Sequence, residues 1–206
     1  MLEQLIPNFV LEKKRLGHIA NSGWIMGYNV TYSGPEYLEN AYPEDWRAIY
    51  EKRNYWFVDP VAAWSLSETG STRWSAIRYT LDRKPFMEHA MMFGLRYGAC
   101  FASNENNRRS FLTLSRKDRE FTDDEIADVH GRFIIWQAHV NRIIELTEDE
   151  KHILRLFRTG MSRQAVAEAA DVSEATVKRR MHDANVKMQC RSTAQAVAYA
   201  TARKLI

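Results

Sequence analysis

The 206-residue sequence predicts an α+β protein with two domains, and three observations support this prediction. Segments typical of β-strands are interspersed with helical patterns over residues 1–145, which predicts an α/β/α sandwich around a mostly antiparallel sheet. Residues 146–206 instead contain four short helical patterns, each with a capping residue and a tight turn, which predicts an all-α domain. The hydrophobic share of 45% and the charged share of 27% are ordinary for a globular chain with a packed core.

The first domain is predicted to begin with an amphipathic helix over residues 2–20 and a strand over residues 24–32. The strand is rich in β-forming residues and ends at the turn signal of residues 33–35. Pro43 and the pair Asp59-Pro60 each predict the start of a helix, because proline fits the first helical turn, where its missing N–H is not needed.

In the middle of the chain, the sequence pattern predicts a strand over residues 70–74 and then a helix over residues 81–93. A strand pair over residues 97–102 and 109–115 and a long helix over residues 123–145 are predicted to follow. Gly94 is a suitable C-cap for the first of these helices. The polar residues 104–108 suit a hairpin loop between the paired strands. Since the long helix is expected to end just before Thr147, the linker between the two domains is predicted to be very short.

The second domain predicts four helices capped by Thr147, Ser162, Ser173, and either Ser192 or Thr193. Thr147 and Glu150 form the pattern of a capping box, in which the two side chains satisfy each other's backbone N–H groups. The second helix is rich in alanine and is followed by a tight turn. These features match a helix-turn-helix motif, because small residues let two helices cross closely.

The positive charge of the chain is concentrated in this second domain. Residues 146–206 contain 11 Lys and Arg against 7 Asp and Glu, while the rest of the chain contains 18 against 19. A small basic domain attached to a near-neutral one suggests contact with nucleic acid. On charge alone, a chance asymmetry of the surface stays open as the alternative.

The third helix of the second domain carries the candidate DNA-binding surface. Val177, Met181 and Ala184 share one face and are expected to pack inward. The other faces are basic, and basic side chains near the start of such a helix reach base edges and phosphates in the major groove. The alternative from spacing alone is a solvated basic helix. The candidate DNA-binding residues are Ser173, Thr176, Lys178, Arg179, Arg180, His182, Lys187 and Arg191.

Along its whole length, the second domain resembles the LuxR/GerE-type helix-turn-helix. The resemblance rests on Leu146-Thr147, Gly160, Val172-Ser173, Thr176-Val177, Lys187, Gln195-Ala196-Val197-Ala198 and Leu205-Ile206. It implies binding to double-stranded DNA. The sequence departs from the family pattern at Ala165, Arg180, Asp183, Gln189 and Thr193. These departures leave the DNA target open, and they motivate an alternative function, an anti-activator that sequesters another regulator and binds DNA weakly or not at all.

A second unusual segment, residues 41–74, contains eight aromatic side chains around the carboxylate of Asp59. Tyr and Trp combine a large apolar area with one hydrogen-bonding group each, so they line pockets for small apolar ligands. A carboxylate among aromatic rings needs a donor, and a ligand N–H could supply it. The alternative is an aromatic core with Asp59 as the N-cap of a helix that begins at Pro60.

This segment, together with the residues that follow it up to Ser115, resembles the autoinducer-binding domain of LuxR-type receptors. The matching positions are Tyr42, Trp46, Asp59-Pro60, Trp74, Gly94, Gly98 and the run Phe111–Ser115. The resemblance implies an N-acyl-homoserine lactone as ligand. It further implies that Trp46 donates to the lactone carbonyl, that Asp59 accepts from the ligand amide, and that Tyr42, assisted by Thr113, donates to the acyl carbonyl. Trp74 would pack on the lactone ring and Tyr50 along the acyl chain.

The chain before Tyr42 is shorter than in typical LuxR-type receptors, so the resemblance assigns no roles to residues there. Tyr28, Val30 and Tyr32 are the candidates in that region for the wall around the acyl chain.

Together, the two resemblances imply a quorum-sensing transcriptional regulator that responds to an N-acyl-homoserine lactone, and we expect it to bind DNA as a homodimer. We expect no other cofactor and no metal, because the six histidines are scattered and form no ligand cluster. We expect no enzymatic activity, since neither a Ser/His/Asp or Cys/His arrangement nor a GxSxG pattern occurs. The absence of a signal peptide or a membrane-spanning stretch, with only two distant cysteines, predicts a cytoplasmic protein with no membrane partner. The acyl-chain length, the DNA site and the sign of regulation cannot be predicted from the sequence.

Overall fold

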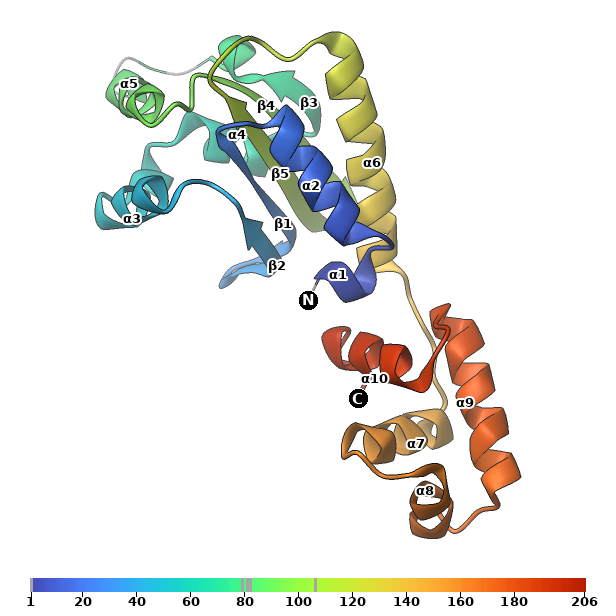
Figure 1. Cartoon of the computed structure of the whole chain (residues 1–206). Helices are drawn as coiled ribbons and strands as arrows, with labels where there is room; N and C mark the ends of the chain where they lie inside the picture. The colour runs from blue at the N-terminus through green and yellow to red at the C-terminus, as the bar shows by residue number, and fades with distance from the viewer. Residues whose placement is uncertain (1, 79, 81–82, 106) are drawn as a thin grey trace. The chain divides into compact units, whose positions relative to one another are not determined.

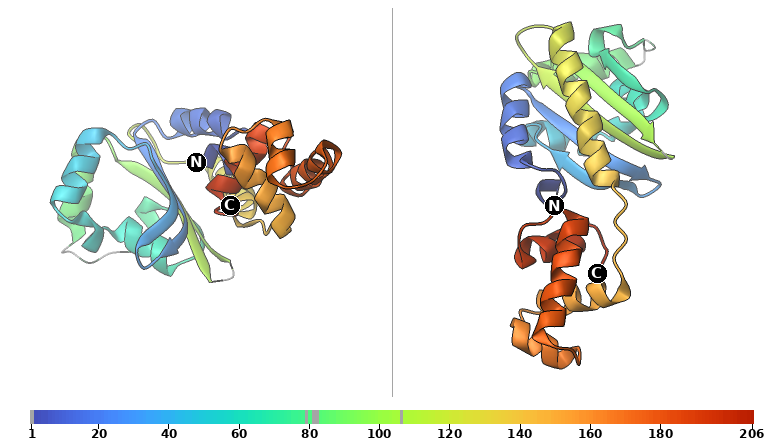
Figure 2. Two further views of the ribbon diagram at one scale, coloured as in Figure 1. Left: turned by 90° about the horizontal axis from the view of Figure 1, so that it is seen from below. Right: turned by 90° about the vertical axis from the view of Figure 1, so that its right-hand side faces the viewer.

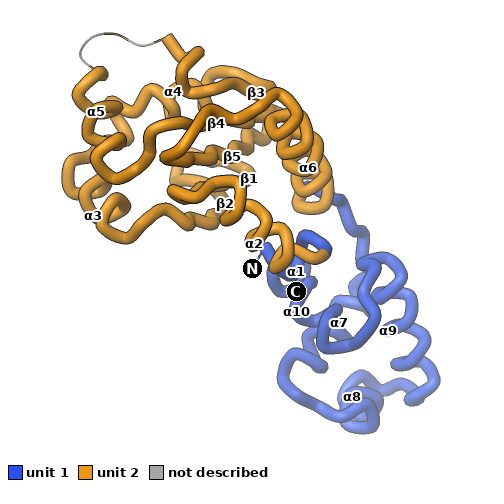
Figure 3. Tube along the Cα trace, turned by 45° about the horizontal axis from the view of Figure 1, so that its top comes forward, with its two compact units in different colours: residues 1–7, 141–206 blue, residues 8–140 orange. Residues whose placement is uncertain are grey.

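The computed structural model describes residues 2–78, 80, 83–105 and 107–206. The chain forms two compact units (Figure 3). One unit, the sheet unit, comprises Asn8–Val140. The other, the helical unit, comprises residues 141–206 together with the first seven residues of the chain.

The sheet unit is built on an antiparallel sheet. Within the described residues its strands are β1 (Gly23–Thr31), β2 (Gly34–Asn40), β3 (Gly70–Arg73), β4 (Tyr97–Glu105) and β5 (Arg108–Arg116), in the spatial order β2-β1-β5-β4-β3. Successive side chains of a strand point to opposite faces, so the sheet presents two different surfaces. On central strand β5, Phe111 and Thr113 face one side, while Leu112 and Leu114 face the other and are fully buried.

Helices cover both faces of this sheet (Figures 1 and 2). One face carries α2 (Phe9–Ile19) and α6 (Asp123–Asn141), and the other carries α3 (Glu44–Lys52), α4 (Pro60–Ser67) and α5 (Lys84–Met92). Two short 3-10 turns, η1 (Tyr55–Phe57) and η2 (Trp74–Ala76), complete the second layer. The predicted α/β/α sandwich is therefore confirmed.

Three expectations about single elements were wrong. The helix expected over residues 2–20 is broken after Leu5, because Pro7 disfavours helical geometry at the residue before it and Asn8 adopts a left-handed φ of 57°. Strand β2 was missed, since its Gly-Pro start resembles a turn, but proline is tolerated in an edge strand. Helix α6 ends at Asn141, so the linker of residues 142–147 is longer than expected. The first two residues of the helix expected over 81–93 lie outside the described residues, and α5 begins at Lys84.

The helical unit contains α7 (Glu148–Arg158), α8 (Arg163–Ala169), α9 (Glu174–Met188) and α10 (Thr193–Ala202), and also α1 (Leu2–Leu5) from the start of the chain. The expected caps of α7, α8 and α9 are confirmed, and Ser192 caps α10. Helices α7, α8 and α9 pack on one another around buried apolar side chains, so the all-α prediction is also confirmed.

Candidate functional site

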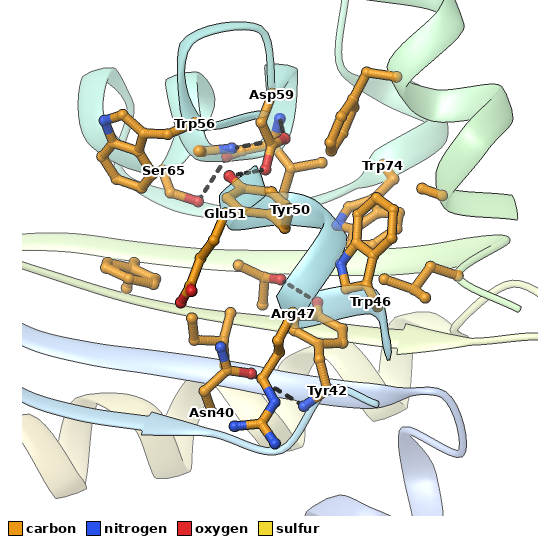
Figure 4. Close-up of a pocket in the computed structure, with 18 of the residues that line it drawn as sticks. Asn40, Tyr42, Trp46, Arg47, Tyr50, Glu51, Trp56, Asp59, Ser65 and Trp74 are labelled. Carbon is orange, nitrogen blue, oxygen red and sulfur yellow. Dashed lines mark hydrogen bonds between the residues drawn. The ribbon is translucent and has the colours of Figure 1, made fainter. Parts of the chain in front are cut away.

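A cavity of about 140 Å³ lies in the sheet unit between the sheet and the layer of α3, α4 and α5 (Figure 4). Most of its wall is apolar, and its few polar groups come from different elements. The six residues that the resemblance implies as ligand-binding all line this one cavity: Tyr42, Trp46, Tyr50, Asp59, Trp74 and Thr113. Segments that are 71 residues apart in sequence are therefore brought together by the fold.

Asp59 is held in place by the start of α4. As N-cap it adopts extended backbone geometry before Pro60, and its Oδ1 accepts from the N–H groups of Val61 at 2.7 Å and Ala62 at 3.2 Å. Its other oxygen, Oδ2, accepts from the hydroxyl of Tyr50 at 2.9 Å (Figure 4). The expected N-cap role of Asp59 is therefore confirmed, but it does not exclude a ligand, because Asp59 lines the cavity and an oxygen such as Oδ2 can accept a second hydrogen bond beside the one from Tyr50.

Burial makes Asp59 an unusual carboxyl group. The side chain is 8% exposed, and desolvation raises its pKa to about 6 from an ordinary value of 3.8. The hydrogen bonds from Tyr50, Ala62 and Val61 act in the opposite direction but do not cancel the effect of burial. A further donor placed against Oδ2 would stabilise the ionised form, so the site is suited to a ligand that carries an N–H group.

Tyr42 and Thr113 form a second polar pair on the cavity wall. Their hydroxyls are 2.8 Å apart and both side chains are buried. Asn40 fixes the backbone of Tyr42 by accepting its N–H at 3.1 Å. Each hydroxyl can donate as well as accept, so when Thr113 donates to Tyr42, the Tyr42 proton is free for an acceptor in the cavity. The same burial raises the pKa of Tyr42, which therefore stays a neutral donor.

Trp46 and Trp74 form a further part of the cavity wall. Trp46 on α3 packs among the rings of Tyr55, Phe86 and Phe93, with centroid distances of 5.3–5.9 Å. Figure 4 shows the indole nitrogens of Trp46 and Trp74 on the ring edges that face Tyr50. An indole nitrogen can only donate, so these edges suit acceptor atoms of a ligand.

Trp74 can lie flat on the sheet only because β4 has a glycine beneath it. A Cβ atom added to Gly98 would lie 2.1 Å from Cδ2 of the Trp74 ring, which is far inside van der Waals contact. This glycine was matched by resemblance alone, and the close approach gives it a physical role.

Several other residues of the cavity wall were not identified from the sequence. Residues 61, 62, 65 and 66 line it through one face of α4, and the helical spacing of these positions was a usable signal. Phe86 and Ala90 reach it from α5, which no local pattern indicates. The suggestion that Tyr28, Val30 or Tyr32 lines the cavity was wrong, because none of the three belongs to its wall. Tyr28 stacks on Phe133 on the α6 side of the sheet, and Tyr32 is fully exposed.

In the helical unit, α9 buries the predicted face of Val177, Met181 and Ala184. The opposite surface exposes Lys178, Arg179 and His182, and Arg191 is exposed just after the helix. Ser173 caps α9 by accepting the N–H of Thr176 at 3.2 Å, so these two hydroxyls also order the start of the helix.

Two of the predicted DNA-binding side chains have partners inside the unit. Arg180 pairs with Asp149 at 2.5 Å, and Lys187 pairs with Glu150 at 2.8 Å. Glu150 is 5% exposed and also accepts the N–H of Thr147 in the capping box, so its buried charge needs a cation nearby. Lys187 supplies that charge and joins the end of α9 to the start of α7.

The sequence of the sheet unit matches the autoinducer binding domain family over residues 29–142. Residues 145–200 match the family described as bacterial regulatory proteins, luxR family. The chain belongs to the LuxR family. As expected of such a member, it combines an autoinducer-binding domain with a helix-turn-helix.

Individual relatives agree with this assignment. The chain is 29% identical over 213 residues to the transcriptional activator protein TraR of Rhizobium radiobacter, covering 94% of this chain and 91% of TraR. It is 26% identical to RpaR of Rhodopseudomonas palustris, a quorum sensing-dependent transcriptional regulator, covering 82% of this chain and 74% of RpaR. The crystal structure of Escherichia coli SdiA has the same fold, with a TM-score of 0.51, 22% identity and coverage of 100% of this chain and 92% of SdiA.

The protein is therefore an autoinducer-responsive transcriptional regulator, and the sequestering alternative is not favoured. Among the residues that the structure describes, no helix has the length and hydropathy to cross a membrane. Within the same residues, no cluster of three or more His, Cys, Asp or Glu side chains could hold a metal ion.

Proposed function

We propose that the autoinducer is an N-acyl-homoserine lactone, that it binds in the cavity between the sheet and α3–α5, and that the protein acts as a homodimer on double-stranded DNA. The observation that carries the ligand proposal is the position of Asp59, a buried carboxylate on the wall of a mostly apolar cavity, whose Oδ2 accepts from Tyr50. A carboxylate oxygen can accept a second hydrogen bond, and the amide N–H of an acyl-homoserine lactone has the matching chemistry.

The remaining polar groups of the cavity fit the other polar atoms of such a ligand. In the proposed complex, Trp46 donates to the lactone carbonyl and Tyr42 donates to the acyl carbonyl, supported by Thr113. The Trp74 ring covers the lactone ring, and Tyr50 borders the acyl chain while it holds Asp59. A ligand that lacks one of these atoms leaves a buried partner unpaired, at a cost of about 1–3 kcal/mol.

For DNA, we propose that α9 enters the major groove with its exposed basic side chains. Lys178, Arg179 and His182 are exposed outside the packed face and would contact DNA, and the exposed Arg191 would contact the phosphate backbone. Ser173 and Thr176 contribute at the start of the helix. Arg180 and Lys187 act mainly by fixing α9 on α7 through their ion pairs.

For the homodimer, we propose that α6 pairs with α6 of a second copy. Its outer surface exposes small and apolar side chains at helical spacing: Ala127, Gly131, Ile134, Ile135 and Ala138. A two-fold axis brings one such patch against itself. In sedimentation experiments, Ile135→Glu should give a monomer, whereas the control Leu38→Glu, which also charges an exposed apolar residue, should leave the mass unchanged.

The ligand proposal is tested by capture during synthesis. The protein is expressed with a mixture of N-acyl-homoserine lactones of different acyl length, purified and extracted, and the extract is identified by mass spectrometry. We expect one intact lactone at close to one molecule per chain, because a slowly dissociating ligand survives purification and an enzyme would have consumed it. Recovery of no lactone from soluble, folded protein would reject the proposal.

The informative variant is Asp59→Asn. Asparagine still accepts the N–H of Val61 and caps α4, so the fold is retained, but its amide NH₂ group opposes the ligand amide. We expect the lactone to be lost from this variant. The control Asp124→Asn makes the same chemical change on the exposed first turn of α6 and should retain it.

A further inference from the structure

The first helix of the chain packs in the helical unit rather than in the sheet unit that follows it in sequence (Figure 3). Three aliphatic side chains of this segment are almost completely buried, with exposures of 1% for Leu2, 2% for Leu5 and 1% for Ile6. A helix of four residues has no stability of its own, so this burial is what keeps α1 folded.

The partner of α1 is α10. Helix α10 has alanine at every second position from 194 to 202, and such small side chains allow another helix to approach closely. Its buried residues include Ala196, Tyr199 and Ala200. The beginning and the end of the chain thus share one hydrophobic contact inside the DNA-binding unit.

The chain consequently passes from one unit to the other twice, at Pro7–Asn8 and at Val140–Asn141. In the sheet unit the two crossing points are held together, because the Phe9 ring packs edge-on against Trp136 of α6 at 6.2 Å. In the helical unit, α1 is held by α10, and Arg142 donates to the carbonyl of Lys187 at 2.9 Å.

We propose that residues 2–7 form a strap that transmits the stability of the sheet unit to the DNA-binding unit. While α2 and α6 are packed, the contact between Phe9 and Trp136 ties the segment that follows α1 to the last turns of α6, so α1 meets α10 at a high effective concentration. When the packing of the sheet unit loosens, the contact between Phe9 and Trp136 is lost. Helix α1 then leaves α10, and the apolar surface of α10 is exposed. If the proposed function is correct, the ligand stabilises the sheet unit and the strap carries that effect to the helix-turn-helix.

The strap can be tested without any ligand, so failure of the lactone proposal does not affect the outcome. In the full-length double variant Leu5→Ser/Ile6→Ser, we expect hydrogen exchange of the α10 amides to accelerate at least tenfold, while the strands of the sheet stay within twofold of the unaltered protein. The matched control is Val10→Ser/Leu11→Ser on α2, where both side chains are exposed, at 49% and 63%. It should leave α10 unchanged. Equal exchange of α10 in the strap variant and the unaltered protein would overturn the proposal.

A double-mutant cycle separates transmission from simple loss of contacts. Phe133→Leu weakens the sheet unit at a fully buried position of α6. We expect it to accelerate exchange in α10 when the strap is intact and to have no further effect in the strap variant. An equal effect of Phe133→Leu in both backgrounds would refute transmission through α1. If the double variant fails to fold, Leu5→Ala alone replaces it in the same cycle. Tryptophan fluorescence then reports whether the sheet unit is still folded, because all six tryptophans lie within residues 24–136.

Discussion

The buried carboxyl of Asp59 makes the stability of the sheet unit depend on pH. Its pKa is about 6 in the folded chain and 3.8 in the absence of structure. The folded form therefore binds a proton more tightly than the unfolded form. The resulting stabilisation is complete below pH 3.8 and is lost as the pH rises through 6. The full effect of the shift is about 3 kcal/mol.

Between pH 8 and pH 5 the expected change is about 1.4 kcal/mol, because Asp59 is ionised at pH 8 and mostly protonated at pH 5. Other groups titrate in this range too, so the measurement compares ligand-free wild type with Asp59→Asn, which has no proton to gain. Urea unfolding followed by tryptophan fluorescence reports only on the sheet unit, since every tryptophan lies within residues 8–140.

The wild type should gain about 1.4 kcal/mol relative to Asp59→Asn when the pH is lowered from 8 to 5. A difference that stays constant with pH would refute the account of Asp59 as a desolvated carboxyl. Protonation of Asp59 stabilises the fold but weakens ligand binding. The amide N–H needs the ionised form, so lactone affinity should fall about tenfold between pH 7 and pH 5.

Two further predictions concern the cavity, and a third concerns the helical unit. Gly98→Ala should displace the Trp74 ring and abolish retention of the lactone in the capture experiment, while circular dichroism shows an intact sheet. Unchanged retention would mean that Trp74 has no role in binding. Tyr42→Phe should weaken lactone binding by about 1–3 kcal/mol in calorimetry, and an effect below a few tenths would exclude its hydroxyl as a donor. Lys187→Met should destabilise the helical unit by about 1–2 kcal/mol in thermal unfolding, because Glu150 is buried but the Lys187 side chain is 38% exposed; a stable variant with weaker DNA binding would make Lys187 a phosphate contact.

Features decided by local chemistry were predicted well from the sequence. Asp59-Pro60 starts α4 because capping involves only neighbouring backbone groups, and the capping box of Thr147 and Glu150 fixed the start of α7. The break after Leu5 was missed although Pro7 indicated it, because the apolar spacing on either side suggested one continuous helix.

Features decided by distant parts of the chain were not predictable from local patterns. Nothing near Lys187 indicates that it pairs with a glutamate 37 residues earlier, and its basic charge suggested DNA contact instead. The buried face of α6 is likewise set by the sheet against which the helix packs: Val129, Phe133 and Trp136 are buried, whereas the neighbouring Ile134 is 44% exposed. The docking of α1 on α10 depends on the tertiary fold alone.

Nuclear magnetic resonance of the indole N–H groups shows whether the lactone occupies this cavity and accepts a hydrogen bond from Trp46. Protein labelled with ¹⁵N at tryptophan should give six indole signals, and Trp46→Phe identifies one of them. On addition of the lactone retained in the capture experiment, we expect a downfield shift of the Trp46 N–H proton, and no such shift in Asp59→Asn. A Trp46 signal that does not move while the lactone binds would show that Trp46 is not a donor to the ligand.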